Sequence, residues 1–380
     1  MYVNKLCASL EKKFFIISKK QDNFSSSVSF FYEKLIRPSL FQLETEKAHD
    51  FGVHALELLA KSKFACKILK SFLLEKSRPV ELWGLKFPNV IGQAAGLDKD
   101  GQFPRASEAL GFGHIEVGTV TPVRQDGNEK PRLFRVPKQR ALINRMGFNN
   151  LGADNLLNNI SEKFPKNERS VPLGINLGKG KNTPLEEAMD DYKKSFFKLA
   201  HMADYITINI SSPNTPGLRK LHLKENLAPF LQGIKDFREE WTACNKTASP
   251  PCLLKISPDE NYVTIETIVG LIRDFGFDGI VASNTSVNHE AHKVLDINTT
   301  GGLSGRPIGQ KSNEIINFIS KLTNGNFPII GCGGIHDYES ARRKLDAGAN
   351  LLQLYTGFIY EGPFLPNKLS TQISKEVSWV

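Results

Sequence analysis

The sequence has few of the features that mark disulfide-bonded, metal-binding or membrane-spanning proteins. Its five cysteines are scattered, odd in number and free of any CxxC pair or Cys/His cluster. We therefore expect reduced thiols, no disulfide framework and no bound metal. A run of about 18 apolar residues, the minimum for a spanning helix, is also missing, because charge interrupts the stretch LCASLEKKFFIISKK near the start.

The motifs of several large enzyme classes are absent as well. The sequence has no HExxH, no Walker A loop, no GxSxG and no pair of carboxylates at metal-binding spacing. Metal-assisted hydrolysis, phosphoryl transfer and serine-hydrolase chemistry each depend on one of these arrangements. Their absence favours a reaction in which a bound cofactor carries the chemistry.

The composition is that of an ordinary globular protein, with 40% hydrophobic and 23% charged residues. A length of 380 residues allows one large α/β domain or two or three smaller ones. The net charge is +9, and residues 1–80 hold 14 basic against 8 acidic side chains. This excess fits a solvated basic surface, or attraction to anionic lipid or to an import machinery. Nucleic acid is not expected as a partner, because the basic residues alternate with large apolar ones.

The first part of the chain has the pattern of a polar leader followed by short amphipathic helices. Residues 1–26 are rich in lysine and serine and weakly resemble a mitochondrial presequence, although arginine is missing. Apolar spacing predicts a first helix in VSFFYEKLI that ends at Pro38, a second over about 46–61 and a third in FACKILKSFLLE. These can be ordinary core helices, or helices that lie on a membrane surface, which their basic and aromatic character also fits.

From about residue 80, short apolar runs alternate with helical stretches. Eight such runs occur, at 89–93, 114–118, 173–177, 205–209, 252–256, 279–283, 328–332 and 351–355. Repeated βα units predict a parallel sheet, and eight of them predict a closed (β/α)8 barrel. A doubly wound open sheet is the alternative, but its usual GxGxxG after the first strand is missing. An extra hairpin is predicted over 132–143.

The carboxyl ends of the strands form the active site in such barrels, so the residues after each run are the candidates. Glycine-rich segments follow the last strands, namely TGGLSG (300–305), GCGGI (331–335) and YTG (355–357). Glycine leaves backbone N–H groups accessible to a phosphate, and this position is a common phosphate site of the fold.

Lysines and asparagines also gather at the predicted strand ends. Lys255 interrupts an apolar run and should point into the barrel, where a cation would stabilise a reduced flavin. Lys99 is flanked by Asp98 and Asp100, so a surface salt bridge is an equal alternative for it. Amide side chains carry both donors and acceptors and suit an imide or pyrimidine ring. The asparagines at these positions are Asn144, Asn149, Asn176, Asn209, Asn214 and Asn284.

These segments resemble the class 2, quinone-linked, membrane-associated dihydroorotate dehydrogenases over residues 28–375. The resemblance rests on AAGLDKDG, EVGTVTP, LINRMGFNN, GINLGKGK, NISSPNTPGLR, LKISPD, SNTS, TGGLSGRP, IIGCGGI and LQLYTG, in family order and spacing. It implies oxidation of dihydroorotate to orotate in pyrimidine biosynthesis, with FMN as redox carrier and a membrane quinone such as ubiquinone as acceptor.

The resemblance also implies which residues carry each role. FMN would be bound by Ala95, Gly96, Lys99, Thr119, Asn176, Asn209, Lys255, Ser283, Gly305, Gly333, Gly334, Tyr355 and Thr356. Dihydroorotate would be held by Lys99, Asn144, Arg145, Met146, Gly147, Phe148, Asn209, Ser212, Asn214, Asn284 and Thr285. The catalytic residues would be Ser212, Lys99 and Thr215.

Ser212 would be the base that takes the proton from C5 of dihydroorotate, while the C6 hydride goes to N5 of the flavin. Class 1 relatives carry cysteine at this position, so the serine favours class 2. Serine is a poor base and would pass its proton to water or through Thr215.

The resemblance divides the chain into three parts: a targeting or flexible segment (1–27), a helical domain that forms a quinone tunnel and contacts the membrane (28–78), and the FMN-binding barrel (79–380). Gln42, His49, Arg135 and Tyr355 would line the tunnel. Because the leader exceeds what a bacterial member needs, we expect the mitochondrial inner membrane. No obligatory protein partner is expected.

Two alternatives remain open from the sequence. One is a soluble FMN oxidoreductase that uses fumarate or NAD, against which the basic amphipathic N-terminus and Ser212 count. The other is a membrane-peripheral flavoprotein without turnover, which the intact motif residues disfavour.

Overall fold

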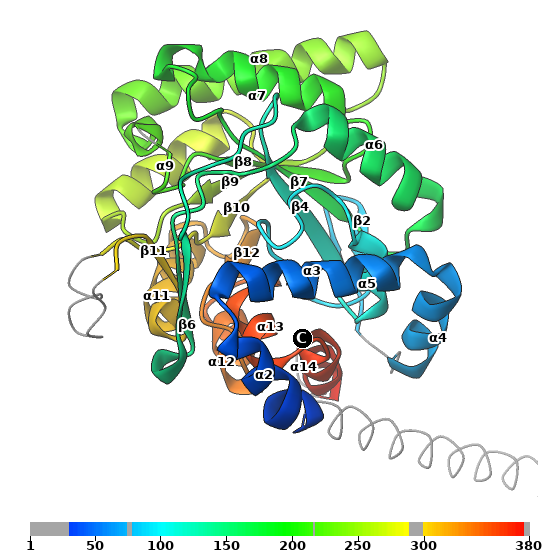
Figure 1. The fold of residues 1–380 in the computed structure, drawn as a ribbon. Helices are drawn as coiled ribbons and strands as arrows, with labels where there is room; N and C mark the ends of the chain where they lie inside the picture. The colour runs from blue at the N-terminus through cyan, green and yellow to red at the C-terminus, as the bar shows by residue number, and fades with distance from the viewer. Residues whose placement is uncertain (1–29, 74–77, 216, 289–298, 376–380) are drawn as a thin grey trace, which may run out of the picture.

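A closed barrel of parallel strands forms the centre of the molecule (Figure 1). The computed structural model describes residues 30–73, 78–215, 217–288 and 299–375, so the segment expected over 1–27 lies outside the described residues. The eight predicted runs all form barrel strands, in the order β10–β12–β13–β3–β4–β7–β8–β9. The prediction of a (β/α)8 barrel is confirmed. The strands are β3 (Ile91–Gln93), β4 (His114–Val120), β7 (Leu173–Leu177), β8 (Tyr205–Asn209), β9 (Cys252–Ile256), β10 (Gly279–Ala282), β12 (Ile329–Cys332) and β13 (Leu351–Leu354).

Helices cover the outside of the barrel, as Figure 1 shows. Local chemistry fixes several of their starts: Asn261 caps one helix by accepting the N–H of Thr264, and Asp337 and Ser340 form a capping box on another. The helices after the barrel strands are α5 (Pro104–Ala109), α6 (Ala153–Lys163), α7 (Ala188–Leu199), α8 (Lys224–Asn245), α9 (Tyr262–Asp274), α11 (Gly309–Leu322), α12 (Tyr338–Asp346), α13 (Thr356–Glu361) and α14 (Leu365–Lys375).

Alternation along the strands separates an outer apolar shell from the barrel interior, which holds a smaller apolar cluster and a layer of polar side chains. In β8, Ile206 and Ile208 belong to the large apolar cluster between strands and helices. The alternate residues Tyr205 and Thr207 face inward, where both donate to Glu116 of β4. The larger core cluster therefore lies between the barrel and its helices, and the interior combines a smaller apolar cluster with buried polar groups such as Glu116.

The N-terminal helices lie beside the barrel and match the predicted amphipathic pattern. They are η1 (Tyr32–Ile36, a π-helix), α2 (Arg37–Gln42), α3 (Thr45–Lys61) and α4 (Lys63–Leu73). The prediction that Pro38 ends the first helix is wrong. Pro38 lies in the first turn of α2, directly after the π-helical turn, where its missing N–H is tolerated. None of the described helices has the length and apolarity to cross a membrane.

Two small sheets flank the barrel. The predicted hairpin forms as β5 (Leu133–Val136) and β6 (Ala141–Asn144). An unpredicted third strand, β11 (Gly302–Gly305), pairs antiparallel with β6. A second hairpin, which was not predicted, joins β1 (Val80–Leu82) to β2 (Leu85–Phe87). The glycine-rich sequence of β11 hides its strand character, because pairing with β6 rather than side-chain propensity makes it extended.

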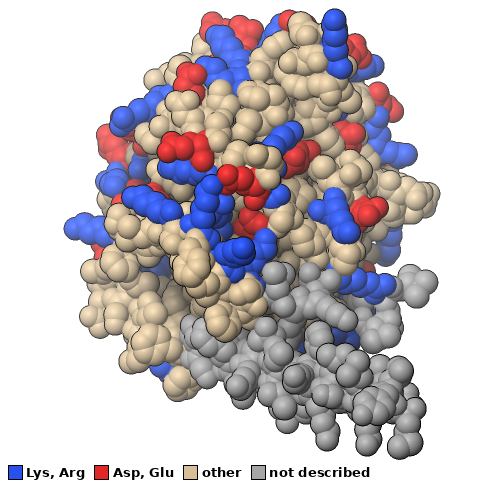
Figure 2. All heavy atoms as spheres, turned by 90° about the vertical axis from the view of Figure 1, so that its right-hand side faces the viewer, with Lys and Arg blue, Asp and Glu red and all other residues tan. Residues whose placement is uncertain are grey.

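Charges of both signs are mixed on the outer surface. On the face drawn in Figure 2, lysines and arginines are interspersed with acidic residues. The part of this face that belongs to the described residues therefore carries charges of both signs side by side.

Candidate active site

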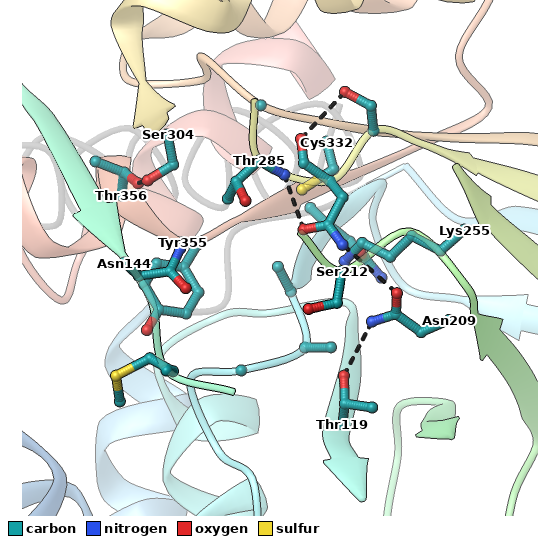
Figure 3. Close-up of a pocket in the computed structure, with 18 of the residues that line it drawn as sticks. Thr119, Asn144, Asn209, Ser212, Lys255, Thr285, Ser304, Cys332, Tyr355 and Thr356 are labelled. Atoms are coloured by element: carbon teal, nitrogen blue, oxygen red, sulfur yellow. Dashed lines mark hydrogen bonds between the residues drawn. The ribbon is translucent and has the colours of Figure 1, made fainter. Parts of the chain in front are cut away.

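A pocket opens at the carboxyl ends of the barrel strands, which we call the mouth of the barrel. Most residues predicted to bind cofactor or substrate line it (Figure 3). They are Ala95, Gly96, Lys99, Thr119, Asn144, Met146, Gly147, Phe148, Asn209, Ser212, Asn214, Lys255, Ser283, Asn284, Thr285, Gly305, Gly333, Gly334, Tyr355 and Thr356. The structure thus brings together residues from all parts of the barrel sequence.

Some predicted residues lie outside the lining. Asn176 lies beneath it and accepts a hydrogen bond from Asn209 at 3.1 Å. Arg145 points away, donating to the carbonyl of Pro131 at 2.9 Å. Thr215 is buried, and its Oγ1 has no hydrogen-bond partner in the described part of the chain. The relay from Ser212 through Thr215 therefore stays a prediction.

Glycine backbone forms one side of the pocket, at the end of β11 and just after β12. Gly305 and Gly334 have φ of +95° and +78°, which side-chain-bearing residues rarely adopt. A Cβ on Gly334 would lie 2.2 Å from the Cα of Gly309, and one on Gly305 would lie 2.4 Å from the carbonyl oxygen of Arg140. The side-chain oxygens of Ser304 and Thr356 lie 2.8 Å apart at the same place. Closely packed glycine backbone and hydroxyls are the groups that bind a phosphate.

Two lysines supply positive charge to the pocket. Lys255 lies in β9 in register with Asn209 of β8, so its side chain enters the barrel near the mouth. Within the described chain, neither Lys255 nor Lys99 forms a salt bridge with a carboxylate, so the surface salt bridge considered for Lys99 is not formed. Burial, and next the charge of Arg132, lower the pKa of Lys99 to about 8. Both ammonium groups are available to an anionic ligand.

Amide side chains from several elements line the pocket, and hydrogen bonds hold them in place. Asn209 donates to Thr119 Oγ1 at 3.0 Å, the contact drawn in Figure 3. Asn284 donates to Ser211 Oγ at 3.0 Å, and Asn214 donates to Asn144 Oδ1 at 3.2 Å. Fixed amides of this kind can present both donors and acceptors to a flat heterocycle.

The segment after β8 carries Ser212 into the pocket. The backbone N–H of Asn214 donates to Ser212 Oγ at 3.3 Å. Arg219 clamps this segment to its neighbours, since it donates to the carbonyl of Ser211 at 3.3 Å and to Asp259 at 3.0 Å. Asp259 follows β9, so the ion pair ties the Ser212 segment to the next strand end of the mouth. Sequence reasoning missed this role of Arg219.

The N-terminal helices contact the barrel next to the mouth. Arg135 of β5 donates to the carbonyl of Leu40 at 3.1 Å, and its guanidinium lies 4.6 Å from the ring centre of Phe41. Burial, and next the charge of Lys99, lower the pKa of His49 to about 4. Of the predicted tunnel residues, Tyr355 lines the pocket whereas Gln42, His49 and Arg135 do not. A continuous tunnel stays a prediction.

Several lining residues were not predicted as site residues. They include Ser304, Ile308, Cys332 and Gln353. Ser304 and Cys332 occur in glycine-rich segments that the sequence places at the mouth, so their position could have been found. Gln353 occupies an inward position of β13, and the alternation of that strand is the signal that would have found it.

Comparison with known proteins identifies the family. The model of the family described as "Dihydroorotate dehydrogenase" matches residues 78–377. The chain belongs to this family. It is 42% identical over 355 residues to the dihydroorotate dehydrogenase (quinone) of Chloroflexus aurantiacus, covering 91% of this chain and 97% of that one. It is 45% identical over 346 residues to the protein of that name from Proteus mirabilis, covering 90% and 100%.

Solved structures agree with this family. The crystal structure of the dihydroorotate dehydrogenase of Eimeria tenella in complex with ferulenol is similar with a TM-score of 0.74 and 32% identity, covering 86% of this chain and 90% of that one. The quinone-linked class expected from the sequence is confirmed. The two curated relatives are bacterial and give no support to a mitochondrial location, which stays a prediction.

Proposed function

We propose that this protein oxidises dihydroorotate to orotate, with FMN as its redox carrier and a membrane quinone as its electron acceptor, in pyrimidine biosynthesis. The observation that carries the proposal is the pocket that joins glycine backbone, two lysines, fixed amides and Ser212. Relatives with this activity in their names are 42% and 45% identical over about nine-tenths of the chain.

The pocket fits FMN chemically. Gly305, Gly333 and Gly334, with Ser304 and Thr356, offer the backbone and hydroxyl groups that a phosphate requires. When bound, FMN would accept a hydride from the substrate and pass the electrons to the quinone. Lys255 supplies the positive charge that stabilises the ring as it gains negative charge, and Thr119 and Asn209 offer hydrogen bonds to its polar edge.

Lys99 and the asparagines hold the substrate in this proposal. Dihydroorotate is a carboxylate with a cyclic imide, so the Lys99 ammonium binds the carboxylate, while Asn144, Asn214 and Asn284 bind the imide edges. Ser212 removes the proton from C5 and passes it to water. A preorganised pocket matters more here than a strong base, because fixed donors stabilise the charge that develops.

The N-terminal helices provide the quinone side. They lie against β5 and the mouth, and their outer faces carry phenylalanines that suit a bilayer surface. We infer that this helical segment rests on the membrane and lets a quinone approach the pocket past Arg135 and His49.

An acceptor comparison tests the proposal. Purified protein is given dihydroorotate with a soluble quinone analogue, with fumarate or with NAD, and the formation of orotate is followed by its absorbance. We expect orotate with the quinone analogue and little with the other two acceptors. Turnover with fumarate or NAD alone would favour the soluble oxidoreductase, and no orotate with any acceptor would reject the proposed reaction.

A further inference from the structure

A buried carboxylate lies below the mouth and is not one of the residues that line the pocket. Glu116 sits on β4 with its side chain inside the barrel, and none of its surface is exposed. In the described part of the chain, no lysine, arginine or histidine forms a salt bridge with it. A charged group in this setting is costly unless hydrogen bonds compensate it, so its partners need an explanation.

Four side chains donate to Glu116, divided unequally between its two oxygens. Oε2 accepts from Tyr205 at 3.2 Å, from Thr207 at 3.1 Å and from Gln353 at 2.8 Å. Among the described residues, Oε1 accepts from Asn176 Nδ2 alone, at 2.7 Å. Burial, and next the charge of Glu116, hold the pKa of Tyr205 well above its ordinary value, so this hydroxyl keeps its proton and donates.

The hydrogen bond to Asn176 fixes the orientation of two successive amides. With its Nδ2 held by Glu116, Asn176 turns Oδ1 toward the mouth, where it accepts from Thr119 at 2.5 Å and from Asn209 Nδ2 at 3.1 Å. Asn209 then turns its own Oδ1 toward Ser211, accepting from Ser211 Oγ at 3.1 Å. The carboxylate of Glu116 thus determines which end of the Asn176 and Asn209 amides points toward the mouth.

We propose that Glu116 is a positioning residue whose carboxylate sets the amide orientation of Asn176 and Asn209, and with it the pattern of donors and acceptors at the pocket. The inference rests on the proposed function, because it assigns this pattern to the recognition of the FMN ring and the substrate. Glu116 itself touches neither ligand, since it does not line the pocket.

An amide in place of the carboxylate disrupts this order. In Glu116→Gln, the three donors around Oε2 retain the carbonyl oxygen, so the new NH2 replaces Oε1 and faces Asn176 Nδ2. The introduced NH2 group and that of Asn176 would then face each other, and neither can accept a hydrogen bond. If the Asn176 amide rotates to relieve this, its NH2 faces Asn209 Nδ2 instead, so two donors oppose each other at the mouth.

The first test measures FMN affinity, which does not depend on turnover. Flavin fluorescence gives the dissociation constant for FMN in the wild type and in Glu116→Gln. We expect the dissociation constant for FMN to rise about tenfold in Glu116→Gln, because a buried donor loses its acceptor. We also expect KM for dihydroorotate to rise and KM for the quinone analogue to stay unchanged. Thr207→Val is the matched control, because it removes one donor to Oε2 and leaves the contact with Asn176 intact. Wild-type FMN affinity in Glu116→Gln would overturn the proposal.

A compensating double variant tests the orientation directly. In Glu116→Gln with Asn176→Asp, the NH2 introduced by the first substitution can donate to one carboxylate oxygen introduced by the second, whose other oxygen still accepts from Thr119 and Asn209. The net charge is also the same as in the wild type. We expect the double variant to bind FMN more tightly than either single variant. An effect equal to the product of the two single effects would contradict the proposal.

Failure of the role of Glu116 and failure of the proposed reaction give different results. If Glu116→Gln does not fold, the double variant decides, and its failure to fold or to bind FMN overturns the role of Glu116. If the wild type binds FMN but forms no orotate, the proposed reaction fails, while the comparison of FMN affinities still decides whether Glu116 orients the amides.

Discussion

The mouth of the barrel and the N-terminal helices are built in opposite ways. The mouth buries polar side chains, and among them Asn209, Ser212 and Lys255 are each at most 5% exposed. The helices expose apolar ones: of the fifteen large hydrophobic residues exposed in the described chain, ten lie within 30–73. The buried polar groups of the mouth suit a polar ligand, and the exposed apolar side chains of the helices suit the membrane contact that we propose.

A buried ion pair fastens the two regions to each other. Glu46 of α3 and Arg132, next to β5, are 4% and 7% exposed, and their closest atoms lie 2.9 Å apart. Burial alone would raise the pKa of Glu46, but hydrogen bonds and charge from Arg132 and Lys130 hold it below its ordinary value. The charge of Arg132 also lowers the pKa of Lys99, so the Glu46–Arg132 ion pair is close enough to affect the electrostatics of the mouth.

The largest expected effect comes from replacing Ser212, the proposed catalytic base. Ser212→Ala should lower the rate at which dihydroorotate bleaches the flavin by at least about 100-fold, the usual range for a general base. FMN should remain bound, and Ser212→Cys should retain part of the rate because a thiol can also take a proton. Stopped-flow absorbance measures the rate, and unchanged bleaching in Ser212→Ala would remove Ser212 from this role.

Breaking the buried Glu46–Arg132 ion pair should destabilise the whole protein. Glu46→Gln leaves the Arg132 guanidinium buried without its anion, and we expect a loss of about 3 kcal/mol in the free energy of unfolding. Glu57→Gln on the same helix is the control, because its partner His54 lies at the surface and such pairs contribute about 0–1 kcal/mol. Urea titration measures both. Equal losses in the free energy of unfolding for the two substitutions would show that the buried ion pair does not stabilise the contact between the helices and the barrel.

The charge of Lys99 predicts how substrate use depends on pH. Its pKa of about 8 means that the ammonium form exists below this pH and is lost above it. Because dihydroorotate is an anion, kcat/KM should fall as pH rises through about 8. Lys99→Arg should move the fall to higher pH, since guanidinium stays charged. A profile that Lys99→Arg does not shift would assign the fall to another group.

A smaller effect is expected at the apolar helix surface. Phe64 of α4 is 74% exposed, and Phe64→Ser should weaken binding to lipid vesicles about tenfold, as expected when one buried phenylalanine is removed. Val263 of α9 is equally exposed on the barrel, and Val263→Ser should leave vesicle binding unchanged. Sedimentation with vesicles measures both. Equal loss in the two variants would reject the helices as the membrane surface.

The sequence predicts the barrel better than its additions, for physical reasons. Parallel strands buried on both faces are continuous apolar runs, so the eight strands and the residues that follow them could be located. Strand β11 could not, because its sequence GLSG has no strand propensity and pairing with β6 alone makes it extended. Pro38 was misread because its position relative to a π-helical turn is not visible in spacing.

Within the site, motifs place side chains but do not reveal how they hold one another. Asn176 and Asn209 were expected at the mouth, whereas their support by Glu116 depends on β4 and β7 lying side by side. Arg219 belongs to a recognised motif, but its clamp to Asp259 joins residues 40 positions apart. Such contacts follow from closure of the barrel and not from any local pattern.

We propose that the mouth and the N-terminal helices serve separate half-reactions, reduction of the flavin by dihydroorotate and its reoxidation by quinone, and a substitution at Arg135 can separate the two. In Arg135→Met, anaerobic mixing with dihydroorotate should bleach the flavin at the wild-type rate. A quinone analogue should then restore the colour about tenfold more slowly, because the substitution removes the hydrogen bond from the charged guanidinium to the carbonyl of Leu40 in the N-terminal helices. Lys138→Met, on the same hairpin but exposed, should alter neither step. If Arg135→Met slows bleaching by dihydroorotate and recovery with quinone equally, the division between mouth and helices is wrong.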